Sequence, residues 1–108
     1  MEYGWIEHKN LIEDSEKVSH ILSLVGNQRR LEVLCHLANG PMCVKELEET
    51  LNLSQSAMSQ HLSKLRAGGL VEFKKEAQTV YYFIENQDLI DLMRALHKIY
   101  CHPKNLSV

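Results

Sequence analysis

The chain has 108 residues, of which 44% are hydrophobic and 24% charged, values typical of one globular domain spanning residues 1–108. Its net charge of −2 argues against a protein that coats nucleic acid without sequence preference, and no uncharged apolar run approaches the roughly 18 residues of a membrane span. The first seven residues carry acids and no secretory-type apolar run, so we expect a cytoplasmic protein without membrane contact, whose three cysteines rest as thiols.

The first helix is predicted over residues 11–25, where Asn10 and Glu13 resemble a capping box. The apolar stripe of this helix comprises Leu11, Val18, Ile21, Leu22 and Val25.

A second helix is predicted over residues 27–39, before the stop signal Gly40–Pro41. Its core stripe is expected to contain Leu31, Leu34, Cys35 and Ala38, widened by Val33 and Leu37. A helix that is apolar on most sides is expected at the centre of the domain.

Two short helices follow, over residues 44–51 and 55–67, and Ser54 is well suited to cap the second of them. The pair Gly68–Gly69 ends that helix, and the tight connection between the two helices is typical of a helix-turn-helix at residues 44–67.

Two β-branched and aromatic runs then predict a hairpin, or wing, over residues 70–84, with Glu76, Ala77 and Gln78 between its strands. Asn86 caps a last helix over residues 87–101. The predicted fold is mainly α with one β-hairpin, a winged helix-turn-helix of order ααααββα.

The helix over residues 55–67 carries the clearest functional signal. Met58, Leu62 and Leu65 share one side, and the opposite side holds no acid. Small hydroxyls, amides and a lysine suit a DNA major groove, although a solvated polar face is the alternative. The predicted contacts are Gln55, Ser56, Ser59, Gln60, Ser63 and Lys64, together with His61, which flanks the apolar side and can also serve packing.

Residues 52–82 form the only block with a positive balance, four Lys and Arg against two acids. Within it Lys74, Lys75 and Gln78 lie near the hairpin tip, where a wing grips the DNA backbone. We also expect a phosphate contact from Arg30 or its neighbour Arg29.

The long apolar stripe of the last helix predicts a homodimer through the first and last helices. Such a dimer reads double-stranded DNA as an inverted-repeat operator, with half-sites about one helical turn apart. About eight phosphate contacts per dimer give a log–log salt slope of roughly −7.

The segments 27–31, 53–62, 65–71 and 75–82 together resemble the ArsR/SmtB family of transcriptional repressors, and the likeness covers nearly all of the chain after residue 15. The contexts of Cys35 and Cys101, residues 30–35 and 96–101, resemble the HlyU, BigR and SqrR branch of this family. That branch implies a homodimeric repressor, without a cofactor, whose two cysteines sense polysulfides, persulfides or oxidants and release DNA when linked.

The residues alone leave open whether Cys35 and Cys101 meet, because a disulfide needs Cα atoms within about 7 Å. Cys35 lies mid-helix on the expected core stripe, so a buried small hydrophobe is its alternative role, and an idle terminal thiol is that of Cys101. His97, Lys98 and His102 are the cationic neighbours that can activate a thiol there.

Metal sensing and protein binding are the rival functions. The segment Cys43–Val44–Lys45 keeps one cysteine of the family's metal motif and replaces the other by lysine. Asp88, Asp91, His97 and His102 do not reproduce its second motif, so we expect no metal site. A winged helix that binds only proteins would not need an acid-free helix face, and no enzyme signature is present.

Overall fold

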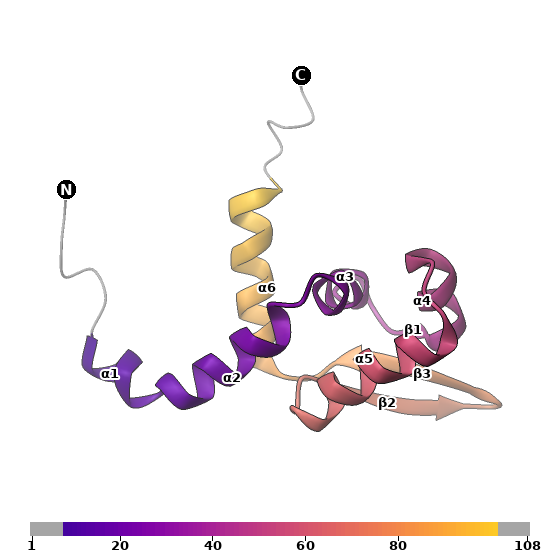
Figure 1. Cartoon of the computed structure of the whole chain (residues 1–108), viewed down its shortest axis with the longest axis horizontal. Coiled ribbons are helices and arrows are strands. Elements are labelled where there is room, and N and C mark those ends of the chain that lie inside the picture. The colour runs from indigo at the N-terminus through magenta and orange to yellow at the C-terminus, as the bar shows by residue number, and fades with distance from the viewer. Residues whose placement is uncertain (1–7, 102–108) are drawn as a thin grey trace, which may run out of the picture.

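The structure is a computed structural model that describes residues 8–101 (Figure 1). Residues 1–7 and 102–108 lie outside the described part. They include the N-terminal segment that the sequence analysis compared with a secretory signal, and they include His102. The helices are α1 (His8–Glu13), α2 (Ser15–Val25), α3 (Gln28–Leu37), α4 (Val44–Leu51), α5 (Gln55–Ala67) and α6 (Gln87–Tyr100). The strands are β1 (Met42–Cys43), β2 (Val71–Glu76) and β3 (Thr79–Ile84). The predicted winged helix-turn-helix is confirmed, with α4 and α5 as the helix pair and β2 and β3 as the wing.

The N-terminal helical segment differs from the prediction. It forms two helices that meet at Asp14, whose backbone dihedrals of φ −95° and ψ 10° interrupt regular helix geometry. The predicted capping box at Asn10 is wrong because α1 begins at His8 and Asn10 lies inside it. Leu11 and Leu22, expected in the core, are 47% and 52% exposed. Figure 1 shows α1 and α2 extending from the rest of the domain, and Ile21 and Val25 are the buried residues of α2.

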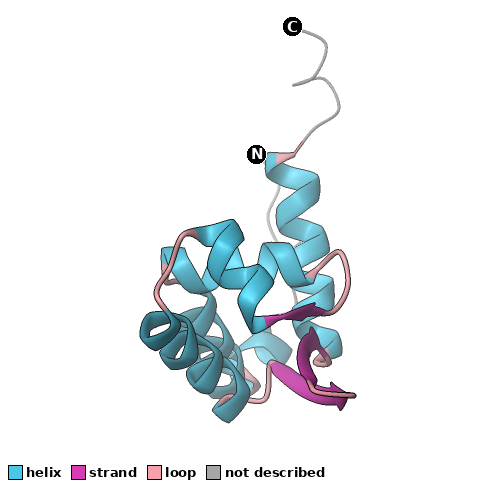
Figure 2. Cartoon of the chain, turned by 90° about the vertical axis from the view of Figure 1, so that its right-hand side faces the viewer, coloured by secondary structure: helices cyan, strands magenta, loops and turns pink. Residues whose placement is uncertain are grey.

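Strand β1 is an element that the predicted order lacks. It pairs with β3 through Met42 opposite Tyr82 and Cys43 opposite Tyr81, and it gives a three-stranded antiparallel sheet of order β1-β3-β2. Two residues are too few to show an alternating pattern in the sequence. Because α4 begins directly after β1, this strand attaches the helix-turn-helix to the wing (Figure 2).

The core lies between the helix-turn-helix, α3 and the base of the wing. Its fully buried side chains come from α3, α4, α5, the turn residue before β2, the start of β2, and α6. They are Val33, Leu34, Leu47, Met58, Leu62, Leu65, Leu70, Val71 and Leu89. Three of them belong to the predicted inner side of α5, so the opposite side of α5 is free to face a ligand.

Both ends of α5 are fixed by local hydrogen bonds. The Ser54 hydroxyl accepts a hydrogen bond from the Ala57 amide at 3.1 Å, as its capping role predicts. At the other end the Leu70 amide donates to the Leu65 carbonyl and the Gly69 amide to the Arg66 carbonyl, which is a Schellman motif. Gly69 has a φ of +79°, a conformation that glycine adopts without strain. The end of α5 is therefore well defined where the wing begins.

Candidate nucleic-acid interface and cysteine site

The outer face of α5 presents the predicted DNA contacts to solvent. Its exposed members are Gln55, Ser56, Ser59, Gln60, Ser63 and Lys64. No residue of α5 is acidic, so this face combines hydrogen-bonding groups with a cation and repels no phosphate. Such a face can enter a major groove and reach base edges.

His61 differs from its neighbours on α5 because it is half-buried. Burial, and then the positive charges of Arg30 and Lys64, hold the pKa of His61 below its ordinary value. This shift favours the neutral imidazole, which can donate one hydrogen bond and accept another.

The wing presents Lys74, Lys75 and Gln78, all exposed. Lys74 and Lys75 are consecutive in β2, so their side chains leave opposite faces of the two-stranded ribbon. The connecting loop is Ala77–Gln78, and Ala77 has a φ of 55°, which is unfavourable for a residue with a Cβ. The tip is thus a tight turn with one lysine on each side.

Arg66 links the end of α5 to the wing, which the sequence analysis missed. Its Nε donates to the Glu72 carboxylate at 2.7 Å, and its guanidinium lies 4.3 Å from the centre of the Phe73 ring. The Phe73 ring in turn lies 5.5 Å from that of Tyr82 on β3. We call Arg66, Glu72, Phe73 and Tyr82 the wing anchor. No spacing pattern signals it, because its members come together only across the turn at Gly68–Gly69.

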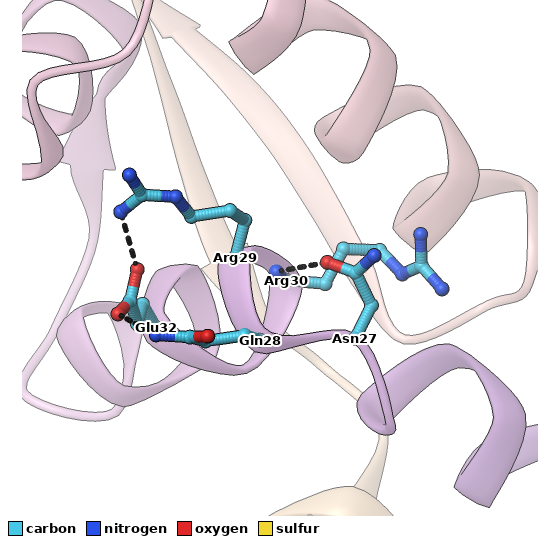
Figure 3. Close-up of polar contacts among 5 residues, drawn as sticks. All are labelled: Asn27, Gln28, Arg29, Arg30 and Glu32. Atoms are coloured by element: carbon cyan, nitrogen blue, oxygen red, sulfur yellow. Dashed lines mark hydrogen bonds and ion pairs between the residues drawn. The ribbon is translucent and has the colours of Figure 1, made fainter.

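Arg29 and Arg30 are also engaged within the protein, and their side chains point in opposite directions (Figure 3). Arg29 pairs with Glu32 at 2.8 Å. The Nε of Arg30 donates to the Leu24 carbonyl at 2.8 Å, and its second guanidinium nitrogen donates to the Ser23 carbonyl at 3.4 Å. Both carbonyls belong to the last turn of α2, where a helix lacks internal partners. Arg30 therefore joins α3 to the end of α2, and its contact with DNA stays a prediction.

Cys35 and Cys101 are both exposed free thiols. The placement of Cys35 on the core stripe is wrong, because α3 is apolar on two faces. Val33, Leu34 and Leu37 are buried in the core. Leu31, Cys35 and Ala38 are less buried and, together with Leu37, line a hollow that α6 borders on its other side. Burial, and then the Cys101 thiol and the Glu32 carboxylate, raise the pKa of Cys35.

Cys43 is separate from this pair. It is the N-cap residue of α4, as expected, and its amide donates to the Glu46 carboxylate at 3.0 Å. Among residues 8–101, no three His, Cys, Asp or Glu side chains gather closely enough to hold a metal ion. The same part of the chain contains no helix with the length and apolar character of a membrane span.

Comparison with known proteins identifies related chains. Residues 27–72 match the model of the bacterial regulatory proteins of the arsR family. The chain is 44% identical over 89 residues to the transcriptional activator HlyU of Vibrio cholerae, an alignment that covers 82% of each protein. It is 31% identical over 104 residues to the biofilm growth-associated repressor of Agrobacterium fabrum, covering 96% of this chain and 89% of that protein.

Solved structures agree with these matches. The structure of reduced HlyU from Vibrio cholerae superposes with a TM-score of 0.81 at 41% identity, covering 87% of this chain and 99% of that one. A solution structure from Mycobacterium bovis, described as a homodimeric winged helix-turn-helix DNA-binding domain of a possible ArsR-family regulator, gives a TM-score of 0.67 at 27% identity and covers 94% of each chain.

Proposed function

Because the chain belongs to the bacterial ArsR family and is a DNA-binding transcriptional regulator rather than an enzyme, we propose that it represses as a homodimer and releases DNA when Cys35 and Cys101 become linked. The observation that carries the proposal is the exposure of Cys35 on the side of α3 that faces α6, the helix that ends beside Cys101.

The dimer is supported by apolar side chains that the described part of one chain leaves exposed. Ile12 on α1 is 65% exposed, Leu22 on α2 is 52% exposed and Ile99 on α6 is 56% exposed. Side chains of this kind gain about 25 cal/mol for each Å² that a partner removes from water. The similar Mycobacterium bovis domain is described as homodimeric, and these helices are the surface through which we expect this chain to pair.

Two-fold symmetry places two α5 helices on one side of the dimer. They are then expected to enter successive major grooves of an inverted repeat, with half-sites about 34 Å apart. The predicted base and phosphate contacts are those of the exposed α5 face, and Lys74, Lys75 and Gln78 of each wing contact the flanking backbone. The whole chain serves as one winged helix-turn-helix domain.

The sensing step uses both thiols and an organic persulfide, RSSH, as oxidant. The Cys101 thiolate attacks the outer sulfur of RSSH, so that RS⁻ leaves and Cys101 becomes a persulfide. Cys35 then attacks the inner sulfur, and a disulfide forms as hydrosulfide leaves. The sum is two Cys–SH plus RSSH giving Cys–S–S–Cys, RSH and H₂S. A trisulfide bridge needs a second RSSH, which makes both cysteines persulfides before they join with loss of hydrosulfide, so that two Cys–SH plus two RSSH give Cys–S–S–S–Cys, two RSH and H₂S. The bridge joins α3 to the end of α6 and changes the spacing of the two α5 helices.

The test is an electrophoretic mobility shift with the DNA upstream of the chain's own gene. The reduced protein should bind, and a polysulfide should lower its affinity by roughly 5- to 150-fold, the usual range of coupling between two sites. The variants Cys35→Ser and Cys101→Ser should bind as tightly as the reduced protein and should not respond, whereas the matched control Cys43→Ser should respond normally. Release of Cys35→Ser by polysulfide would refute the sensing mechanism, and failure of the reduced dimer to bind would refute the regulator itself.

Intact mass distinguishes the chemistry of the link. A loss of two hydrogens per chain indicates a disulfide, and a gain of sulfur on top of that loss indicates a polysulfide bridge. Both species should be absent from the Cys101→Ser variant.

A further inference from the structure

A hollow of about 840 Å³ lies between α3, the loop that follows it, the end of β3 and one face of α6. This volume is in the range of sites that bind small organic molecules. Leu31 and Cys35 line it from α3, Phe83 and Ile84 from β3, and Ile90 and Met93 from α6. The walls are thus mainly apolar.

The hollow is much larger than the proposed thiol chemistry requires. Each S–S bond is only about 2 Å long, so a bridge of a few sulfur atoms between Cys35 and Cys101 occupies a small part of this space. The remaining space extends along α6 to Ile90, nearly three turns away from the end of the helix at Tyr100. Linking the two cysteines does not account for it.

The basic side chains that line the hollow lie on one of its walls, α6. Arg94 and His97 line it from neighbouring positions on α6, and none of the lining residues is acidic. The carboxylate of Asp91 lies 4.0 Å from the Arg94 guanidinium and already accepts a hydrogen bond from Gln87 at 3.1 Å. The Arg94 guanidinium therefore keeps donors available for an anion at the edge of an apolar cavity.

We propose that this hollow binds an amphipathic organic monoanion, a medium-chain or aryl carboxylate, without a covalent bond. The apolar body of the ligand packs between Leu31 and Met93, and its carboxylate contacts Arg94 and His97. Since Cys35 lies in the same wall, the bound anion covers its thiol. The site does not depend on thiol sensing, because none of these contacts is covalent and the carboxylate is held by Arg94 and His97 rather than by a cysteine.

Isothermal titration of the reduced protein with decanoate tests the proposal. Decanoate should bind once per chain, and decyltrimethylammonium, which has the same chain length and the opposite charge, should bind at least roughly tenfold more weakly because its head group meets Arg94. Arg94→Gln should weaken decanoate binding by a similar factor. The matched control is Lys98→Gln, which removes an exposed cation of α6 that does not line the hollow.

A second variant fills the hollow without altering the core. Ala38 is exposed, lines the hollow and has a φ of −62°, which any residue adopts, so Ala38→Phe should fold normally and abolish decanoate binding. Saturating decanoate should also slow the alkylation of Cys35 by iodoacetamide and leave that of Cys43 unchanged. Undetectable binding, equal binding of the cationic and anionic probes, or full binding to Ala38→Phe would each overturn the proposal.

The double variant Cys35→Ser, Cys101→Ser separates this proposal from the proposed function. It should bind decanoate as the reduced protein does, even though it no longer responds to polysulfide. Loss of decanoate binding in the double variant would overturn the non-covalent site and leave the sensing mechanism intact.

Discussion

The salt dependence of DNA binding distinguishes cations that contact phosphate from cations that hold the protein together. In the described part of the chain, Lys64 on α5 and Lys74 and Lys75 on the wing have no ion pair. Arg66, by contrast, is paired with Glu72 and lies over the Phe73 ring within the wing anchor. Arg29 and Arg30 are similarly engaged by Glu32 and by the end of α2. A dimer therefore offers six free lysines, and the log–log salt slope should be roughly −5 rather than the −7 expected from about eight phosphate contacts.

The perturbation is Arg66→Gln, which removes the contact with the Phe73 ring. A cation over an aromatic ring at an exposed site contributes roughly 0.5–1 kcal/mol, so losing it in both protomers should weaken DNA binding by roughly 5- to 30-fold. The salt slope should stay unchanged because no phosphate contact is lost. The matched variant Lys74→Gln should instead make the slope less negative by roughly 2.

The assay is fluorescence anisotropy of labelled operator DNA across a series of KCl concentrations. If Arg66→Gln changed the slope as Lys74→Gln does, Arg66 would be a phosphate contact, and the idea that the wing anchor positions the wing would be refuted. Normal affinity with a normal slope would equally refute it, because the wing would then keep its position without Arg66.

Three further predictions follow from local geometry. Ala77→Gly should raise the free energy of unfolding by roughly 0.5–1 kcal/mol, because relief of the positive φ outweighs the added entropy of the unfolded chain. The control Ala95→Gly, in the middle of α6, should lower the free energy of unfolding by roughly 1 kcal/mol. Thermal unfolding measures both, and a destabilised Ala77→Gly would contradict the turn geometry. Because the pKa of Cys35 is raised, the rate of its alkylation by iodoacetamide should still increase above pH 9. The same alkylation should be faster in Cys101→Ser, because Cys101 is one of the groups that raise this pKa. Peptide mass spectrometry measures both rates, and a plateau below pH 8 would contradict the prediction. The hydrogen bond from the Cys43 amide lowers the pKa of Glu46 in the folded protein. The stabilisation that Glu46 contributes should therefore be complete above the pKa of Glu46 in the unfolded chain and be lost as the pH falls through its pKa in the folded protein. Acid unfolding of Glu46→Gln should lack this pH-dependent loss of stability.

The sequence predicts the helix-turn-helix well because its signals are local. Ser54 and Asn86 cap α5 and α6 through their own side chains, and Gly68–Gly69 ends α5 through a short-range motif. The inner side of α5 follows from periodicity alone. These features need no knowledge of distant segments, and they locate the exposed face on which the predicted DNA contacts lie.

The errors arise where partners are distant in sequence. Strand β1 exists because β3, about forty residues later, offers it a paired edge. The face of Cys35 could not be assigned from spacing because α3 is apolar on both sides and only the position of α6 separates core from hollow. The wing anchor was not predicted, because Glu72 and Phe73 approach Arg66 only after the chain reverses at Gly69. Each of these depends on a tertiary contact.

Helix α3 is the element through which thiol chemistry can reach DNA. It contacts α2, α4, α5 and β3, and its buried side chains Val33, Leu34 and Leu37 make it part of the same rigid core as the helix-turn-helix. A close-packed core of this kind moves as a unit. The end of α6 is different, because Ile99, Tyr100 and Cys101 are exposed in the single chain. A bridge between Cys35 and Cys101 would therefore displace α6 rather than α3. Since α6 belongs to the surface through which we expect the dimer to form, the displacement would alter how two unchanged reading units are spaced on DNA.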